Sequence, residues 1–173
     1  MDNPVNEAPP PSPGEAGSAS WLMRRQYISL LRENEIVTAN LYAVYARKLH
    51  SAAKFWEDLV KDEQAHAEVM MGIEQLIDDG KASFRRPDDF RLPDIKAGIT
   101  WIRHMIESTE QSGTTLRDAL DTAIKVEQTM IESKFFHVMD SDDPAIRKEF
   151  EDLHKHTVEH LGRITSRRRR LLW

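Results

Sequence analysis

Residues 61–67 read Lys-Asp-Glu-Gln-Ala-His-Ala and interrupt an otherwise apolar helical stripe. Glu63 and His66 are three residues apart, so on a helix their side chains lie on one face and can hold one ion together. An unpaired charge in a core costs several kcal/mol, so the pair predicts a buried partner or a bound metal ion. The stripe repeats at steps of three and four, and its members are Trp56, Leu59, Glu63, His66, Met70, Ile73 and Ile77.

The composition indicates one helical domain without cysteine. The chain has 173 residues, enough for a real core, with 40% hydrophobic residues, 31% charged residues and seven glycines. The lack of cysteine excludes disulfides, thiolate zinc sites, iron–sulfur clusters and thiol catalysis. The net charge of −5 gives no general reason to expect binding to nucleic acid or membranes. No apolar run approaches the roughly 20 residues of a membrane span, and no signal-peptide pattern opens the chain, so a cytoplasmic location is expected.

The start of the chain predicts a tail followed by a long helix. Residues 1–20 are rich in Pro, Ser, Gly and Ala, which is typical of a disordered segment. A helix is expected from Trp21 to about Leu49, and Glu35 interrupts its apolar stripe.

A second helix and a long connection follow. Ser51 is the expected N-cap of the second helix, which ends at the Asp-Asp-Gly of residues 78–80. Residues 81–94 contain two prolines and several charges and read as a loop, and the spacing of four isoleucines predicts an amphipathic helix over about residues 95–112.

The second half of the chain predicts another pair of helices. Thr115 is the expected cap of the third bundle helix, with Asp118 resembling the partner in a capping box, and Glu127 is the third carboxylate on an apolar stripe. The Ser-Asp-Asp-Pro of residues 141–144 is a strong start for the last helix. The stripe of that helix consists of Ile146, Phe150, Leu153, His156 or Thr157, His160 and Ile164.

These elements predict an all-α fold of three parts. We expect a four-helix bundle over residues 21–166, in which two antiparallel helical hairpins are joined by a long crossover containing a short helix. Residues 1–20 form the disordered tail, and residues 167–173 form a basic C-terminal tail. The arginines at 167–170 are interpreted as a solvated helix end that the helix dipole favours, with a docking role as the alternative.

The two predicted turns set the register of the bundle. Glu35 and His66 have their midpoint at position 50.5, on the first turn, and Glu127 and His160 have theirs at 143.5, on the Asp-Asp-Pro turn. These four side chains and Glu63 are therefore expected at one level of the bundle. Pairing Glu127 with His154 instead would place the turn near position 140.5, closer to the end of a helix.

Two further histidines differ in their predicted roles. His156 lies one turn before His160 and can join the cluster. Glu151 and His154 also have the Glu-x-x-His spacing, but they lie off the stripe and about a turn away. We interpret Glu151 and His154 as surface residues.

This pattern resembles the ferritin-like superfamily, specifically the rubrerythrin-related di-iron carboxylate proteins. The resemblance rests on Glu35 followed seven residues later by Tyr42, on the Asp-Glu-Gln-Ala-His of residues 62–66, and on the Thr-Leu-Arg-Asp-Ala-Leu of residues 115–120 that leads into Glu127. In that family each helical pair contributes a Glu and then a Glu-x-x-His, which together hold two iron ions. The resemblance implies the metal ligands Glu35, Glu63, His66, Glu127 and His160.

The resemblance covers about residues 25–166 and departs from the family pattern at three points. Thr157 replaces the Glu of the second Glu-x-x-His and is a poor ligand that cannot bridge two cations. The additional helix-three Glu of rubrerythrins falls on Met130, and the cysteine-ligated rubredoxin module, the usual electron relay there, is absent. His156 can make up for Thr157 in a nitrogen-richer site, and a broken or single-metal site is the alternative.

Each predicted ligand also has an interpretation without metal. Glu63 and His66 can form a buried hydrogen-bonded pair. The alternative partners are Lys134 or Arg117 for Glu127, and Glu35 or Glu63 for a core His160.

Two classes of function remain open from the sequence. The first is a non-haem iron protein that oxidises Fe(II) with O₂ or peroxide, as a ferroxidase or a peroxide scavenger supplied by an unknown electron donor. Iron suits mixed carboxylate and imidazole ligands, with Mn or Zn as alternatives. The resemblance implies that peroxide binds at open metal positions and that a site carboxylate returns protons. It also places Tyr42 at the site, where it donates a hydrogen bond to a ligand carboxylate or acts as a redox radical.

The second class is a metal-free helical module that dimerises and recruits partners with its tails, and a homodimer is expected.

Overall fold

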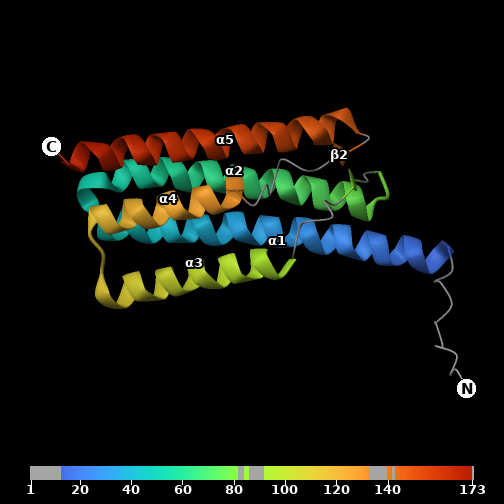
Figure 1. The fold of residues 1–173 in the computed structure, drawn as a ribbon, viewed down its shortest axis with the longest axis horizontal. Helices are drawn as coiled ribbons and strands as arrows, with labels where there is room; N and C mark the ends of the chain where they lie inside the picture. Colours follow the sequence, from blue (N-terminus) through green and yellow to red (C-terminus); the bar gives the residue numbers. More distant parts are fainter. Residues whose placement is uncertain (1–12, 82–83, 86–91, 133–139, 142, 173) are drawn as a thin grey trace, which may run out of the picture.

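The computed structural model describes residues 13–81, 84–85, 92–132, 140–141 and 143–172. Within these residues the chain is all-helical apart from one pair of two-residue strands, β1 and β2, which pair antiparallel through Phe84 with Ser141 and Arg85 with Asp140. Figure 1 shows the helices lying side by side in a bundle, with α5 and α3 at opposite edges. The elements in order are α1 (Pro13–Lys48), η1 (His50–Ala52), α2 (Ala53–Asp78), β1 (Phe84–Arg85), α3 (Leu92–Ser112), α4 (Leu116–Glu132), β2 (Asp140–Ser141), α5 (Pro144–Arg169) and η2 (Arg170–Leu172).

Helices α1 and α2 pack against each other through their apolar stripes. The chain reverses between them in the short 3₁₀ turn η1, at the turn predicted near residues 50–51. Ser51 was expected to cap α2, and that prediction is wrong: the 3₁₀ turn continues through Ala52, which takes the N-cap position and has no side-chain oxygen to accept a hydrogen bond. The interior of α2 buries every member of the predicted stripe, including Glu63 and His66.

Helix α4 packs against α5, and α3 packs along α1. Thr115 caps α4, because its Oγ1 accepts a hydrogen bond from the Asp118 backbone N–H at 3.1 Å. Asp143 caps α5, since its Oδ1 accepts from the Ala145 N–H at 2.8 Å, and Pro144 is the first helical residue. Both predicted helix starts are confirmed.

The helices extend further at both ends of the chain than the sequence pattern predicts. Helix α1 begins at Pro13, so residues 13–20, which were expected to be part of the disordered tail, are helical, and the rest of that tail lies outside the described residues. Helix α5 runs through Arg169 and continues into η2, so the expected boundary at residue 166 is wrong. The reason at the C-terminal end is packing: Arg168 forms an ion pair with Asp121 of α4, and the Arg167 guanidinium lies over the Phe55 ring of α2.

The connection between α2 and α4 contains a longer helix than expected. Helix α3 spans 21 residues and starts at Leu92, three residues before the predicted start. Gly80 and Gly113 adopt positive φ angles of 69° and 73°, where they end α2 and α3. Helix α4 is described to Glu132, and the predicted continuation of its stripe lies outside the described residues. Among the described helices, none has a segment long and apolar enough to cross a membrane.

Candidate metal centre

Five buried ionisable side chains from four helices meet in the interior of the bundle. Each is at most 4% exposed. Helix α1 contributes one carboxylate, α2 a carboxylate and an imidazole, α4 a carboxylate and α5 an imidazole. The five residues are Glu35, Glu63, His66, Glu127 and His160, the set that the register of the predicted turns places at one level.

Glu63 lies at the centre of this cluster and contacts histidines on two helices. Its Oε2 is 3.2 Å from Nδ1 of His66, and its Oε1 is 2.9 Å from Nδ1 of His160. Nδ1 of His66 is also 3.6 Å from Oε2 of Glu35, and Nδ1 of His160 is 3.8 Å from Oε1 of Glu127. Both imidazoles therefore turn the same ring nitrogen, Nδ1, toward the carboxylates.

Several of these donor atoms are buried without a hydrogen-bond partner in the described part of the chain. They are both oxygens of Glu35, Oε1 of Glu63 and Nδ1 of His160. Glu63 Oε1 and His160 Nδ1 are close in distance but do not have hydrogen-bond geometry, so they converge without satisfying each other. One ligand atom each from Glu63, His66 and His160 lies within 4.8 Å of the other two, a group that can hold a metal ion.

Burial and mutual repulsion favour the protonated forms of the Glu35 and Glu127 carboxyl groups. Burial raises the pKa of Glu35 well above its ordinary value, and the nearby Glu63 carboxylate adds to that shift. Burial likewise raises the pKa of Glu127, with the charge of Glu63 as the next cause. A positive charge bound in the cluster would favour the ionised carboxylates and would therefore oppose both shifts.

The pKa values of Glu63 and His66 shift the other way, toward the charged forms of both side chains. Burial acts to raise the pKa of Glu63, but the imidazoles of His160 and His66 close to its oxygens outweigh burial, so that pKa is lowered. Burial acts to lower the pKa of His66, but the carboxylates of Glu35 and Glu63 outweigh it and raise the pKa to about 10. In the metal-free cluster the shifts thus favour the charged forms of Glu63 and His66 and the protonated forms of Glu35 and Glu127, so a metal ion competes with protons for the site.

Tyr42 lies beside the cluster and is fully buried. Its hydroxyl donates a hydrogen bond of 2.7 Å to Oε1 of Glu127. Burial raises the pKa of Tyr42 well above its ordinary value, so the phenol stays protonated and donates this hydrogen bond. No ion pair between Glu127 and Arg117 occurs among the described residues, and Lys134 lies outside them.

The predicted ligand His156 lies on the solvent side of the cluster. Its ring stacks on His66 with centroids 5.5 Å apart, and its Nδ1 is 3.4 Å from Nε2 of His66. It is exposed and outside the group of three whose ligand atoms converge. Thr157 is buried, and its hydroxyl donates to the Leu153 carbonyl at 3.0 Å, which is a local helix contact. Of the off-stripe pair, Glu151 is exposed and His154 half-buried.

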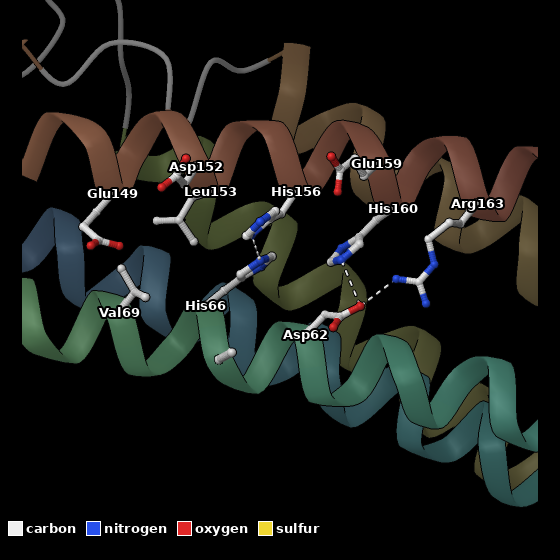
Figure 2. Close-up of a pocket in the computed structure, with 11 residues that line it drawn as sticks. Asp62, His66, Val69, Glu149, Asp152, Leu153, His156, Glu159, His160 and Arg163 are labelled. Carbon is white, nitrogen blue, oxygen red and sulfur yellow. Dashed lines mark hydrogen bonds and ion pairs between the residues drawn. The ribbon is translucent and has the colours of Figure 1, made fainter.

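A pocket between α2 and α5 reaches the two cluster histidines from solvent. Figure 2 shows His66, His156 and His160 pointing into it, with carboxylates around its mouth. Its volume is about 350 Å³. Its lining includes Asp62, Glu149, Asp152, His156, Glu159 and Arg163. Small ions and small oxidants therefore have a path to the site.

Asp62 and Arg163 are site residues that the sequence analysis did not identify. Asp62 Oδ2 lies 3.4 Å from Nε2 of His160 and accepts a 2.6 Å hydrogen bond from Arg163 (Figure 2). A carboxylate behind a histidine orients the ring and leaves the other nitrogen for a ligand. Two features of the sequence could have indicated these residues: Asp62 directly precedes Glu63, and Arg163 follows His160 by three residues.

Comparison with known proteins gives no relative from which a function of this site could be inferred. Family models, curated proteins and solved structures all yield no match to the chain. What the site can do therefore follows from its own donor atoms: three carboxylates and two imidazoles, buried together and incompletely hydrogen-bonded.

Proposed function

We propose that this chain is a ferritin-like protein of rubrerythrin type that binds one or two iron ions and oxidises Fe(II) with O₂ or peroxide. The proposed ligands are the five residues of the buried cluster. A mixed set of carboxylates and neutral imidazoles suits iron, while Mn and Zn are competitors for the same donors.

The observation that carries the proposal is the group of unsatisfied donor atoms in the cluster. A buried polar atom without a partner costs about 1–3 kcal/mol, and four such atoms belong to three residues of the cluster, Glu35, Glu63 and His160. A bound cation would give donor atoms of the cluster a partner and would favour the ionised forms of Glu35 and Glu127, whose pKa values are raised first by burial and then by the neighbouring Glu63 charge. A core assembled only for stability would contain apolar residues at these positions.

The surrounding residues give the site the other properties that such chemistry requires. Iron, when bound, supplies the Fe(II)/Fe(III) couple that exchanges electrons with O₂ or peroxide. Tyr42 orients Glu127, and Asp62 orients His160 with its Nδ1 facing the cluster. The pocket between α2 and α5 admits a small oxidant, while the apolar core excludes bulk water from the other sides.

The proposal is tested by counting metal ions per chain. Protein prepared with excess Fe(II) under anaerobic conditions should retain one to two irons, measured by mass spectrometry, and should oxidise Fe(II) faster than buffer when O₂ or peroxide is added. Glu63→Gln keeps the shape but removes the central charge and should lose most of the iron. Glu151→Gln makes the same change at an exposed position and should keep it.

The same measurement separates the two classes of function. If no iron, manganese or zinc is retained at saturating concentration, the proposal is wrong and the metal-free interaction module is the better interpretation. If metal is retained but Fe(II) oxidation matches the buffer rate, the chain binds metal without the proposed redox activity.

A further inference from the structure

A chain of aromatic rings connects the buried cluster with the molecular surface. Tyr42, which donates to Glu127, has its ring centroid 5.5 Å from that of Trp56. Trp56 in turn is 5.0 Å from Phe55, in an edge-to-face arrangement. These separations are those of rings in contact. Tyr42 and Trp56 are completely buried, and Phe55 is half-buried.

The outer end of this chain lies in a basic groove. The groove has a volume of about 430 Å³ and is lined by Phe55, Gly162, Arg163, Ser166, Arg167 and Arg170. The Arg167 guanidinium stands 4.7 Å from the centroid of the Phe55 ring. Arg163 is neutralised by Asp62, but Arg167 and Arg170 form no ion pair with any described acidic side chain. The groove is thus a local positive surface on a chain of net charge −5.

We propose that this groove docks a small acidic redox protein and that Phe55, Trp56 and Tyr42 conduct its electrons to the metal centre. The inference rests on the proposed function, because electrons are needed at the site only if the metal there is oxidised in turnover. These 173 residues contain no cysteine with which to hold an iron–sulfur centre of their own, and the proposed source of electrons is the acidic partner in the groove.

The reaction at the metal centre defines how many electrons must pass along Phe55, Trp56 and Tyr42, which together form the proposed relay. Reducing one H₂O₂ to two waters consumes two protons, which come from solvent, and two electrons. Each electron comes from one acidic donor protein, which is oxidised by one unit. With metal bound and Glu127 ionised, Tyr42 would give up an electron and its phenolic proton together, with Glu127 as the acceptor of the proton along the 2.7 Å hydrogen bond, and both would return when Trp56 re-reduces the ring.

The surroundings of Trp56 suit it to the position between Phe55 and Tyr42 in this chain of rings. Its Nε1 is buried and has no hydrogen-bond partner among the described residues. An oxidised Trp56 therefore has no base to accept its proton, remains a strongly oxidising radical cation, and recovers by taking an electron alone. Phe55 is difficult to oxidise and serves as the contact through which that electron tunnels from the groove.

The charge of the groove selects the partner. Opposite charge steers a donor to its docking surface and raises the association rate about tenfold or more at low ionic strength. Reduced flavodoxin, an acidic one-electron donor, and reduced cytochrome c, a basic one, are therefore matched probes. Iron-loaded protein with peroxide should oxidise flavodoxin faster at low salt, and that advantage should disappear at high salt.

Variants test the groove and the relay separately. The double variant Arg167→Gln with Arg170→Gln should slow flavodoxin oxidation severalfold without slowing cytochrome c, whereas Arg169→Gln, the same change outside the groove lining, should have a much smaller effect. Trp56→Phe keeps an aromatic ring but should lose most of the electron transfer from flavodoxin. Tyr42→Phe should remove an organic radical that electron paramagnetic resonance detects after freeze-quenching with peroxide and no donor.

Iron content is measured for every variant, which separates this inference from the proposed function. If all variants retain iron but the radical and the flavodoxin rates match wild type, the relay and the docking groove are wrong and the metal centre stands. If Trp56→Phe fails to fold, Phe55→Leu at the half-buried end of the relay provides the same rate test. If wild type binds no iron, both proposals are overturned.

Discussion

Glu63 connects the cluster, because its two oxygens face histidines on different helices. Oε2 contacts His66 one turn along α2, whereas Oε1 contacts His160 on α5. The carboxylate is ionised because both imidazoles favour its charged form, even though burial opposes it. The residue that is exceptional as a polar break in an apolar stripe is therefore also the cluster carboxylate that contacts histidines on two helices.

His66 should be the imidazole on which metal retention depends most. Changing His66→Ala removes a nitrogen next to two carboxylates and should lose most of the bound iron, measured per chain by mass spectrometry. His154→Ala, on α5 but outside the cluster, is the control and should keep the iron. The opposite pattern would show that the metal site lies one turn away.

Thr157 should limit the number of metal ions. It is buried one turn before His160 on the same face of α5, at the position where a rubrerythrin-type site, as proposed here, would need a bridging carboxylate. Thr157→Glu should therefore raise the iron content per chain, while Thr157→Gln, of the same size but uncharged, should not. Equal iron in the two variants would contradict this assignment.

At the scale of elements, α5 carries His160 to the cluster, and its position depends on both of its ends. Asp143 and Pro144 begin the helix, and Arg168 ties its far end to Asp121 of α4. Between these ends, Arg163 holds Asp62 of α2. The register of α5 is therefore set by contacts along its whole length.

Removing the cap of α5 should weaken the fold more than the site. Asp143→Ala leaves the Ala145 N–H without its acceptor and should lower the free energy of unfolding by about 1 kcal/mol. Chemical denaturation of the metal-free protein measures this loss. Iron per chain should be unchanged at saturating Fe(II), and a large loss of iron would mean that the first turn of α5 positions His160 directly.

For the whole molecule, the cluster links stability to pH and to metal. The folded-state pKa values of Glu35 and Glu127 are raised above the ordinary 4.5, so these groups cost no stability below that pH and lower the stability as pH rises from 4.5 toward their folded-state values. Protonated His66, with its pKa raised from 6.5 to about 10, stabilises fully below pH 6.5 and loses this effect as pH rises toward 10. Glu63 has a lowered pKa, so its contribution is present above 4.5 and is lost only in acid.

The metal-free protein should therefore become less stable as pH rises, while metal should protect it increasingly. Because metal binding displaces these protons, the gain in melting temperature on adding Fe(II) anaerobically should be larger at about pH 8 than at about pH 6. Calorimetry at both pH values measures the two gains. A gain that is independent of pH would contradict the protonation of Glu35 and Glu127 in the metal-free cluster.

The sequence by itself determined the helices and the level at which their polar residues meet. Steps of three and four place Glu35, Glu63 and Glu127 on buried faces because helix periodicity is a local property. Capping is also local, so Thr115 and Asp143 could be recognised as helix starts. Two turn positions then sufficed to bring distant residues to the same height in the bundle.

Only the tertiary structure decided which atoms face the cluster and what lies around it. Periodicity assigns a residue to a face, but the side-chain rotamer and the neighbouring helix decide which nitrogen points inward, and so His156 lies on the solvent side of His66. Asp62 and Arg163 acquire their role from a contact between α2 and α5, residues far apart in the chain. The end of α5 also depends on tertiary contacts, because its arginines remain helical through contacts with Phe55 and Asp121 that a local sequence pattern cannot predict.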